Sequence, residues 1–276
     1  PITGAGSNLG RLAVHISCND VVSNGAEPFA IQVLILMSVD NTPQDVENIM
    51  NEISETAKEI DVQIIGGHTE FTDKVISPIV AVTALGKVTH DRLATSTDAK
   101  VGDKIVITKG AGIEGTAILV EDYRELLTEL PKELLDKAEK YYELISVIPE
   151  GRIATELGVK VLHDATEGGV LGALWEIAEA SDVGFIVGEE KVPVRPETRV
   201  ICQHLGIDPL RLLSSGTLIM ITKDTDKLLK ELQASCIDAS VIGTITEKER
   251  GREVISKGKR IPVIGPSNDE LWRVKK

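Results

Sequence analysis

The chain has 276 residues, of which 42% are hydrophobic and 26% are charged, so it can bury a large core in one or two domains. Its 43 acidic and 30 basic residues give a net charge of −13, which argues against a nucleic-acid partner. No apolar run approaches the roughly 20 residues of a membrane span. The three cysteines lack C-x-x-C spacing, which argues against a disulfide framework or structural zinc and favours a cytoplasmic protein.

The first third of the sequence predicts a compact α+β domain. Pro43 opens a helix whose apolar residues, such as Ile49 and Ile53, recur at spacings of three and four. The polar stretch 89–98 is the predicted linker, so we place the two domains at residues 1–97 and 98–276. The predicted elements of the first domain are helices 9–24 and 43–60 and strands 31–39, 62–65 and 75–88.

The second domain is also predicted to mix helices and strands. From residue 116 to residue 145 the sequence is helical almost throughout, with an interruption at Pro131. The other predicted elements are strands 104–107, 159–162, 184–187, 217–222 and 240–245 and helices 168–180 and 226–235.

Gly110, Gly112 and Gly115 form a G-x-G-x-x-G pattern directly after the predicted strand 104–107. This pattern is typical of a dinucleotide-binding turn, but that fold needs a second strand that ends in an acidic residue about 20 residues later. The sequence is helical there instead. The glycines therefore favour a tight turn from a strand into a packed helix.

Acidic residues and glycines meet at three predicted element ends. The first is Asn19-Asp20, although an isolated Asp20 on a solvated helix face is the simpler interpretation. In the second, residues 66–70, a strand predicted to end in Gly-Gly is followed by His68, Thr69 and Glu70, which offer a ring nitrogen, a hydroxyl and a carboxylate within one turn. The alternative is an ordinary turn.

The third place is residues 161–170, which read as a strand, an acidic turn at Asp164, two glycines and a helix. Free N–H groups at that helix start can bind phosphate oxygens, and Asp164 can hold the magnesium ion that neutralises them. Such an arrangement suits phosphoryl transfer, in which positioning and charge neutralisation supply most of the catalysis. A plain N-cap is the competing role for Asp164.

The order of these motifs resembles the aminoimidazole ribonucleotide (AIR) synthase superfamily over nearly the whole chain. The segments that carry the resemblance are 19–20, 25–28, 66–70, 102–103 and 163–169. Residues 112–119 and 205–210 look most like the hydrogenase expression/formation branch and its AIR synthase-related relatives.

The resemblance implies a two-domain α+β, homodimeric enzyme that uses ATP and Mg²⁺ to phosphorylate or activate an oxygen of an unidentified substrate. Apolar residues on both alternations of strands 31–39 and 76–85 agree with a sheet that a second subunit covers. We expect Asp20 and Asp164 to share one metal site. The nucleotide contacts implied are Asn19, Asp20, Gly66, Gly67, Thr69, Gly110 and Gly112, and the catalytic residues are Asp164, His68 and Glu70.

Three departures from the family pattern leave a second interpretation open. Residues 67–70 read Gly-His-Thr-Glu, so the expected carboxylate is displaced, and either His68 faces the nucleotide or Glu70 substitutes. The sequence ends without the Pro-Arg-Ile-Cys tail of the hydrogenase-maturation proteins, and we expect the family's acidic N-terminal segment upstream of Pro1. The alternative function is a catalytically weak nucleotide-binding paralogue that regulates or scaffolds a partner protein.

Overall fold

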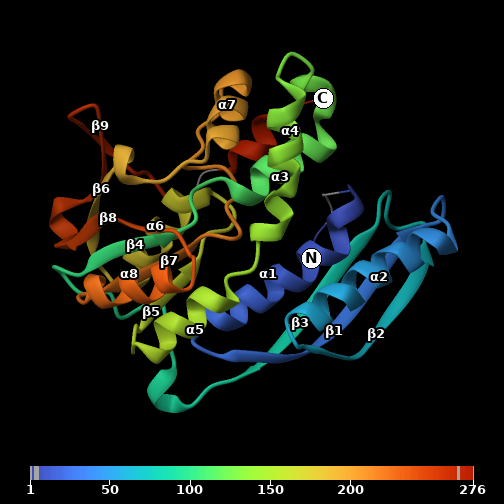
Figure 1. Ribbon diagram of the computed structural model, residues 1–276, viewed down its shortest axis with the longest axis horizontal. Helices are drawn as coiled ribbons and strands as arrows, with labels where there is room; N and C mark the ends of the chain where they lie inside the picture. Colours follow the sequence, from blue (N-terminus) through green and yellow to red (C-terminus); the bar gives the residue numbers. More distant parts are fainter. Residues whose placement is uncertain (1, 3–5, 266–267, 276) are drawn as a thin grey trace.

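The computed structural model of the protein describes residue 2 and residues 6–265 and 268–275. The chain folds around two β-sheets, with helix α1 (Leu9–Ser23) between them (Figure 1). Helix α1 contacts β3 and α2 on one side and α5 and β5 on the other. The predicted α+β fold class is thus confirmed. Within the described residues, no helix is both long enough and apolar enough to cross a membrane.

The first sheet has three strands in the order β2-β1-β3, with β1 parallel to β2 and antiparallel to β3. Helices α1 and α2 cover one face of this sheet, and the other face is open (Figure 1). The Thr42 hydroxyl caps α2 by accepting a hydrogen bond from Asp45 N, and Asp45 Oδ2 accepts a 2.7 Å bond from Thr42 N. The elements are β1 (Glu27–Ser38), α2 (Pro43–Glu59), β2 (Gln63–Thr72) and β3 (Ile79–Lys87).

The prediction that a strand ends at residue 65 was wrong. Strand β2 continues through Gly66 and Gly67 to Thr72 and pairs with β1 along its length. A Cβ atom on Gly67 would lie 2.0 Å from the carbonyl oxygen of Val33, so the glycine allows the two strands to approach. The residues predicted to form a turn therefore lie inside an edge strand.

The second sheet has seven strands in the order β10-β9-β6-β8-β4-β7-β5, antiparallel except for the β6–β9 pair. Its strands are β4 (Lys104–Thr108), β5 (Val161–Asp164), β6 (Gly184–Gly188), β7 (Leu218–Thr222), β8 (Ala239–Thr246), β9 (Arg252–Ser256) and β10 (Lys259–Pro262). Its helices are α3 (Ile113–Asp122), α4 (Lys132–Glu139), α5 (Ile148–Glu156), α6 (Gly169–Ala180), α7 (Pro196–Leu205) and α8 (Thr225–Ala234).

The long helical stretch predicted over residues 116–145 is divided in the structure. Helix α3 ends at Asp122, and two 3-10 segments, Arg124–Leu127 and Lys140–Leu144, flank the short α4. The apolar spacing is real, because Leu135, Ala138 and Tyr141 are buried together, but it is spread over several short elements.

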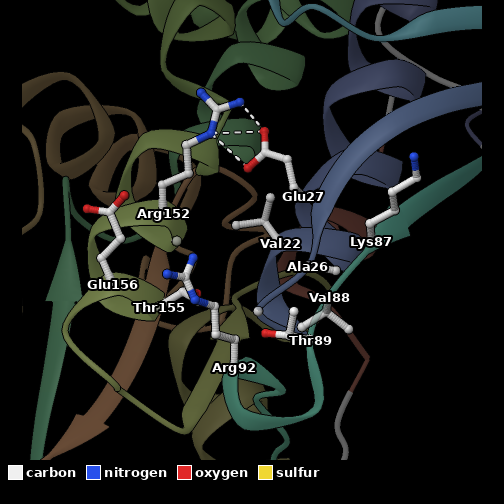
Figure 2. A pocket seen from close by; sticks show the side chains of 12 residues that line it. Val22, Ala26, Glu27, Lys87, Val88, Thr89, Arg92, Arg152, Thr155 and Glu156 are labelled. Carbon is white, nitrogen blue, oxygen red and sulfur yellow. Dashed lines mark hydrogen bonds and ion pairs between the residues drawn. The ribbon is translucent and has the colours of Figure 1, made fainter.

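An ion pair joins the two sheets near the linker. Arg152 on α5 donates from Nε to both carboxylate oxygens of Glu27 on β1, at 3.0 Å each, and from Nη2 to Glu27 Oε1 (Figure 2). Close by, Ala94 N of the linker donates a 3.1 Å hydrogen bond to the carbonyl of Asn24. These contacts hold the linker against the end of α1.

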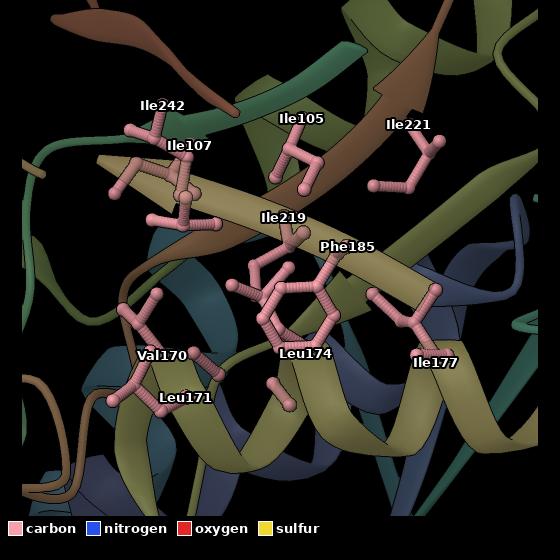
Figure 3. Packing of buried hydrophobic residues seen from close by; sticks show 14 of the residues in the cluster. Ile105, Ile107, Val170, Leu171, Leu174, Ile177, Phe185, Ile219, Ile221 and Ile242 are labelled. Atoms are coloured by element: carbon pink, nitrogen blue, oxygen red, sulfur yellow. The ribbon is translucent and has the colours of Figure 1, made fainter. Parts of the chain in front are cut away.

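The largest core lies between α6 and the seven-stranded sheet (Figure 3). The fully buried ring of Phe185 packs with Leu174 and Ile177 of α6 and with Ile105 and Ile219 of the sheet. Burial of large apolar side chains such as these stabilises a fold by roughly 1.5–3 kcal/mol each. This core supports the end of β5, where Asp164 lies.

Candidate functional site

Two acidic side chains that are distant in the sequence meet where the sheets adjoin. Asp20 lies near the C-terminal end of α1, and the buried Asp164 is the last residue of β5. Ser23, one turn after Asp20, donates a 3.1 Å hydrogen bond from Oγ to Asp164 Oδ1. This bond fixes Asp164 against the helix that carries Asp20.

The two carboxylates lie close enough to repel each other. Asp20 is exposed at the surface, but the protein around it removes part of its water and raises its pKa to about 6, and the Asp164 carboxylate adds to this rise. Burial also raises the pKa of Asp164, although His163 and Ser23 act in the opposite direction. Asp164 Oδ2 is buried without a hydrogen-bond partner among the described residues. A bound cation would stabilise both carboxylates in their charged form.

The donor set fits a magnesium ion that is shared with phosphates. Within the described residues, no group of three or more His, Cys, Asp or Glu side chains is placed to hold a metal ion. Mg²⁺, however, is commonly bound by one or two carboxylates, with water and phosphate oxygens in its other positions. Asp20 and Asp164 with its unpartnered oxygen match that pattern. They do not match a metal site in which the protein supplies every ligand.

His163 orients the end of β5 from the neighbouring position. Its Nδ1 lies 2.7 Å from the carbonyl oxygen of Asp164, and its Nε2 lies 3.0 Å from Glu176 Oε2 on α6. Burial opposes a charge on the ring, but the contacts with Glu176 and Asp164 outweigh it and raise the pKa of His163. The charged form of His163, which these contacts favour, lowers the pKa of the neighbouring Asp164 carboxyl.

Asn19 has a positioning role in this structure, and its nucleotide contact stays a prediction. Its Nδ2 donates a 2.8 Å hydrogen bond to the carbonyl of Ile145, and its Oδ1 accepts a 2.9 Å bond from Val147 N. The side chain is fully buried, so both of its polar groups serve the protein's own backbone. Asn19 therefore holds the next residue, Asp20, at a fixed place relative to the second sheet.

Residues 66–70 lie apart from the two aspartates within one chain. His68 pairs in register with Leu34 on the open face of the sheet, and His68 Nε2 lies 3.6 Å from Glu70 Oε2. Thr69 lies between them in the strand, so its side chain points to the opposite face, which the helices cover. Asp20 lies beside β3, on the other side of β1. A single chain does not bring His68 and Glu70 to Asp20.

Other residues of the protein occupy the space next to the glycines of the Gly110 turn. A Cβ atom on Gly110 would lie 2.8 Å from the Pro193 carbonyl oxygen, and one on Gly112 would lie 2.9 Å from Thr198 Cγ2. Ser214 Oγ accepts a 2.7 Å hydrogen bond from Gly112 N at the start of α3. This structure gives both glycines a packing role, and their nucleotide contact stays a prediction.

A buried glutamate that the sequence did not single out lies just after the Gly110 turn. Glu114, in the first turn of α3, is 2% exposed, and its Oε2 has no hydrogen-bond partner among the described residues. Burial raises its pKa to about 7, with Asp269 and Asp164 adding to the rise. In the sequence, an acidic residue at a helix start is indistinguishable from a solvated one.

Asp20 faces a cavity of about 340 Å³ that lies against β3. Its walls include Ser17 of α1, Asn24 directly after that helix, and Val82 and Ala84 of β3. Ser17 Oγ donates a 3.1 Å hydrogen bond to the Val82 carbonyl, so the wall nearest Asp20 is held in place. Cavities of this size accommodate small ligands.

Both parts of the chain match models of one family. Residues 2–88 match the AIR synthase related protein N-terminal domain, and residues 100–256 match the corresponding C-terminal domain. The chain belongs to the AIR synthase related family. This confirms the predicted two-domain type of fold and the resemblance on which it was based.

The similar proteins include hydrogenase expression/formation and hydrogenase maturation proteins. A putative hydrogenase expression/formation protein of Methanocaldococcus jannaschii is 32% identical over 279 residues, covering 99% of this chain and 81% of the relative. Carbamoyl dehydratase HypE of Cupriavidus necator is 29% identical, covering 91% and 71%. The crystal structure of hydrogenase maturation protein HypE in complex with ATP superposes with a TM-score of 0.82 at 25% identity, covering 98% of this chain and 83% of that one.

Proposed function

We propose that this protein is an ATP- and Mg²⁺-dependent enzyme that phosphorylates an oxygen of a small-molecule or protein-borne substrate. The observation that carries the proposal is that Asp20, which faces a cavity, lies near Asp164, one of whose carboxylate oxygens is buried without a partner among the described residues. Relatives named carbamoyl dehydratase, and a HypE structure that contains ATP, support this reaction type. A carbamoyl-type group is therefore the proposed substrate class.

The chain's own residues position the reacting groups. Asp20 and Asp164 would hold Mg²⁺, which supplies charge neutralisation on the phosphate oxygens of ATP. Ser23 and His163 hold Asp164 at the end of β5, and Asn19 fixes the helix turn that carries Asp20. Transfer of the γ-phosphoryl group of ATP to the carbonyl-type oxygen would release ADP, and the bond between carbon and that oxygen could then break with inorganic phosphate as the leaving group.

We further propose that the protein acts as a homodimer through the open face of the first sheet. Phe29, Leu34 and Leu85 are large apolar residues of this sheet that remain about 40% exposed, at 38%, 38% and 41%. A contiguous apolar face of this kind marks an interaction surface. His68 and Glu70 project from the same face, so a second copy would bring residues 66–70 into an interface. They would contribute to the nucleotide site there.

The domain boundary and the compartment are parts of the same proposal. The two family matches leave residues 89–99 between them, which supports a boundary near residue 97.

Cys18 and Cys202 are buried and Cys236 is exposed, and all three are free thiols, which suits the reducing cytoplasm.

Release of ADP tests the enzymatic proposal. Purified protein is incubated with MgATP and a panel of carbamoyl and amide compounds, and ADP is measured with and without each compound. Substrate-dependent release that requires Mg²⁺ is the expected result. Stabilisation by MgATP in a thermal-shift measurement without ADP release from any compound would favour the catalytically weak nucleotide-binding paralogue, because ligand binding alone raises the stability of the folded state. His68, where the family pattern leads us to expect a carboxylate, is the feature that keeps this second function open.

A further inference from the structure

A second cavity lies between the two sheets and is lined by none of the residues proposed to bind nucleotide or metal. Its volume is about 460 Å³, and it is bounded by the turn after α1, the first linker residues and α5 (Figure 2). Binding pockets of small molecules fall in this size range and often lie where domains meet. The cavity shares Ala26 with the wall of the Asp20 cavity.

Two guanidinium groups line this cavity. Arg152 gives its Nε and Nη2 to Glu27, which leaves Nη1 without a hydrogen bond to any described residue. Arg92 rises from the linker beside Thr155, and its guanidinium makes no hydrogen bond and no ion pair within the described part of the chain (Figure 2). Arginine donors with open positions suit the planar geometry of carboxylate and phosphate groups.

The backbone around Arg92 is fixed before any ligand arrives. Gly25 has a φ of +72°, and a Cβ atom there would lie 2.4 Å from the Arg92 carbonyl oxygen. Arg92 N donates a 2.9 Å hydrogen bond to the Thr89 carbonyl, and Lys160 Nζ contacts the Asp91 carbonyl. Rigid walls reduce the entropic cost of binding.

Apolar side chains line part of the cavity, and of its two carboxylates Glu27 is paired with Arg152, whereas Glu156 limits the negative charge that the cavity accepts. Val22 and Val88 contribute methyl groups to the lining, and Thr89 lies between Val88 and Arg92. Glu156 stands on the same wall as Thr155, so a polyphosphate would meet repulsion there. The cavity therefore combines a place for one anionic head group with a place for an apolar body.

We propose that this cavity binds a small organic anion that carries one phosphate or carboxylate head group on an apolar or ring-shaped body. The head group contacts Arg92, whose guanidinium has no partner among the described residues, and the body lies on Val22 and Val88. The arginine charge itself neutralises the head group, so binding needs no Mg²⁺. In a chain with a net charge of −13, such local cations are what attract an anion.

Isothermal titration calorimetry without Mg²⁺ tests the proposal with phenyl phosphate, benzoate and inorganic phosphate as probes. Either or both of the first two bind the protein, and the better one identifies the head group. It binds more tightly than inorganic phosphate because of the apolar side chains in the lining. Arg92→Gln weakens that binding by roughly tenfold or more, as expected from the loss of a charge-assisted hydrogen bond. Arg250→Gln, which removes the same charge from an exposed site on the 3-10 segment Lys248–Arg250, leaves it unchanged.

Two results would overturn the proposal. One is that neither phenyl phosphate nor benzoate binds, and the other is that Arg92→Gln, folded by circular dichroism, binds the probe as tightly as the parent protein does. Asp20→Asn separates this site from the proposed nucleotide site. It should keep the affinity for the probe even if it loses that for MgATP, and a parallel loss of both would show that the cavity is not an independent site.

Discussion

Ser23 and Asp164 are 141 positions apart in the sequence, yet the Ser23 hydroxyl donates a 3.1 Å hydrogen bond to the Asp164 carboxylate. The bond joins α1, which packs on the first sheet, to β5 at the edge of the second sheet. The acidic pair Asp20 and Asp164 therefore exists only when both sheets are folded and in contact. Any change in the way the sheets pack would alter the site.

Removal of that hydrogen bond should destabilise the fold. Ser23→Ala leaves Asp164 Oδ1 buried with one partner fewer, and we expect the free energy of unfolding in urea to fall by about 1–3 kcal/mol. Ser17→Ala is the matched control on the same helix, because it removes a hydrogen bond to the Val82 carbonyl and leaves no carboxylate unpaired. An equal effect of both variants would show that Asp164 does not depend on Ser23.

Glu114 should make the protein less stable as the pH rises. The folded state holds the Glu114 proton up to about pH 7, whereas the unfolded chain releases it near 4.5, so stability is lost as the pH rises through this window. Between pH 5 and pH 8 we expect the parent to lose about 2–3 kcal/mol relative to Glu114→Gln, which has no proton to release. Parallel stability profiles of the two proteins would contradict this assignment.

His15 should have the opposite pH dependence. Burial, with contributions from Arg11 and Lys109, lowers its pKa to about 3, so the folded state keeps the ring neutral while the unfolded chain takes up a proton below pH 6.5. Acidification from pH 7 to pH 4 should therefore cost on the order of 3 kcal/mol of folding free energy. His15→Gln should flatten this acid limb of the profile, and His90→Gln, an exposed control, should not.

The proposed dimer predicts a sensitivity confined to the open face of the first sheet. Leu34→Glu places a charge at the centre of that face and should convert a dimer into a monomer in analytical ultracentrifugation at micromolar concentration. Ile264 is 78% exposed outside both sheets, so Ile264→Glu should leave the assembly unchanged. A monomeric parent protein would refute the proposed dimer directly.

An element could be predicted from the sequence where all the signals that define it lie in its own residues. Helix α2 was predicted over residues 43–60 and spans Pro43–Glu59, because Pro43, the cap at Thr42 and the apolar spacing all indicate the same helix. Strand β2 was predicted too short, because Gly66 and Gly67 resemble a strand end. Only the partner strand β1 shows that close approach to Val33 is their reason.

The candidate site also has features that the sequence could predict and features that it could not. Asp20 and Asp164 could be paired from motif order, because their residue types and neighbours resemble those of the family. The side-chain bonds of Asn19 to residues 145 and 147 could not be predicted, because they depend on how two distant segments pack. The burial of Glu114 is likewise a property of the fold. Sequence patterns identified the acidic centre but not the groups that hold it in place.

Calorimetric titration of MgATP into the parent protein and into Asp20→Asn tests the central claim most directly. The parent protein should bind ATP in a Mg²⁺-dependent manner, because Asp20 and Asp164 share the Mg²⁺ ion with the phosphates of ATP. Asp20→Asn should bind roughly tenfold or more weakly and should lose most of the Mg²⁺ dependence, with its fold intact. Equal affinity of the two proteins for ATP, with and without Mg²⁺, would contradict the assignment of the metal site to Asp20 and Asp164.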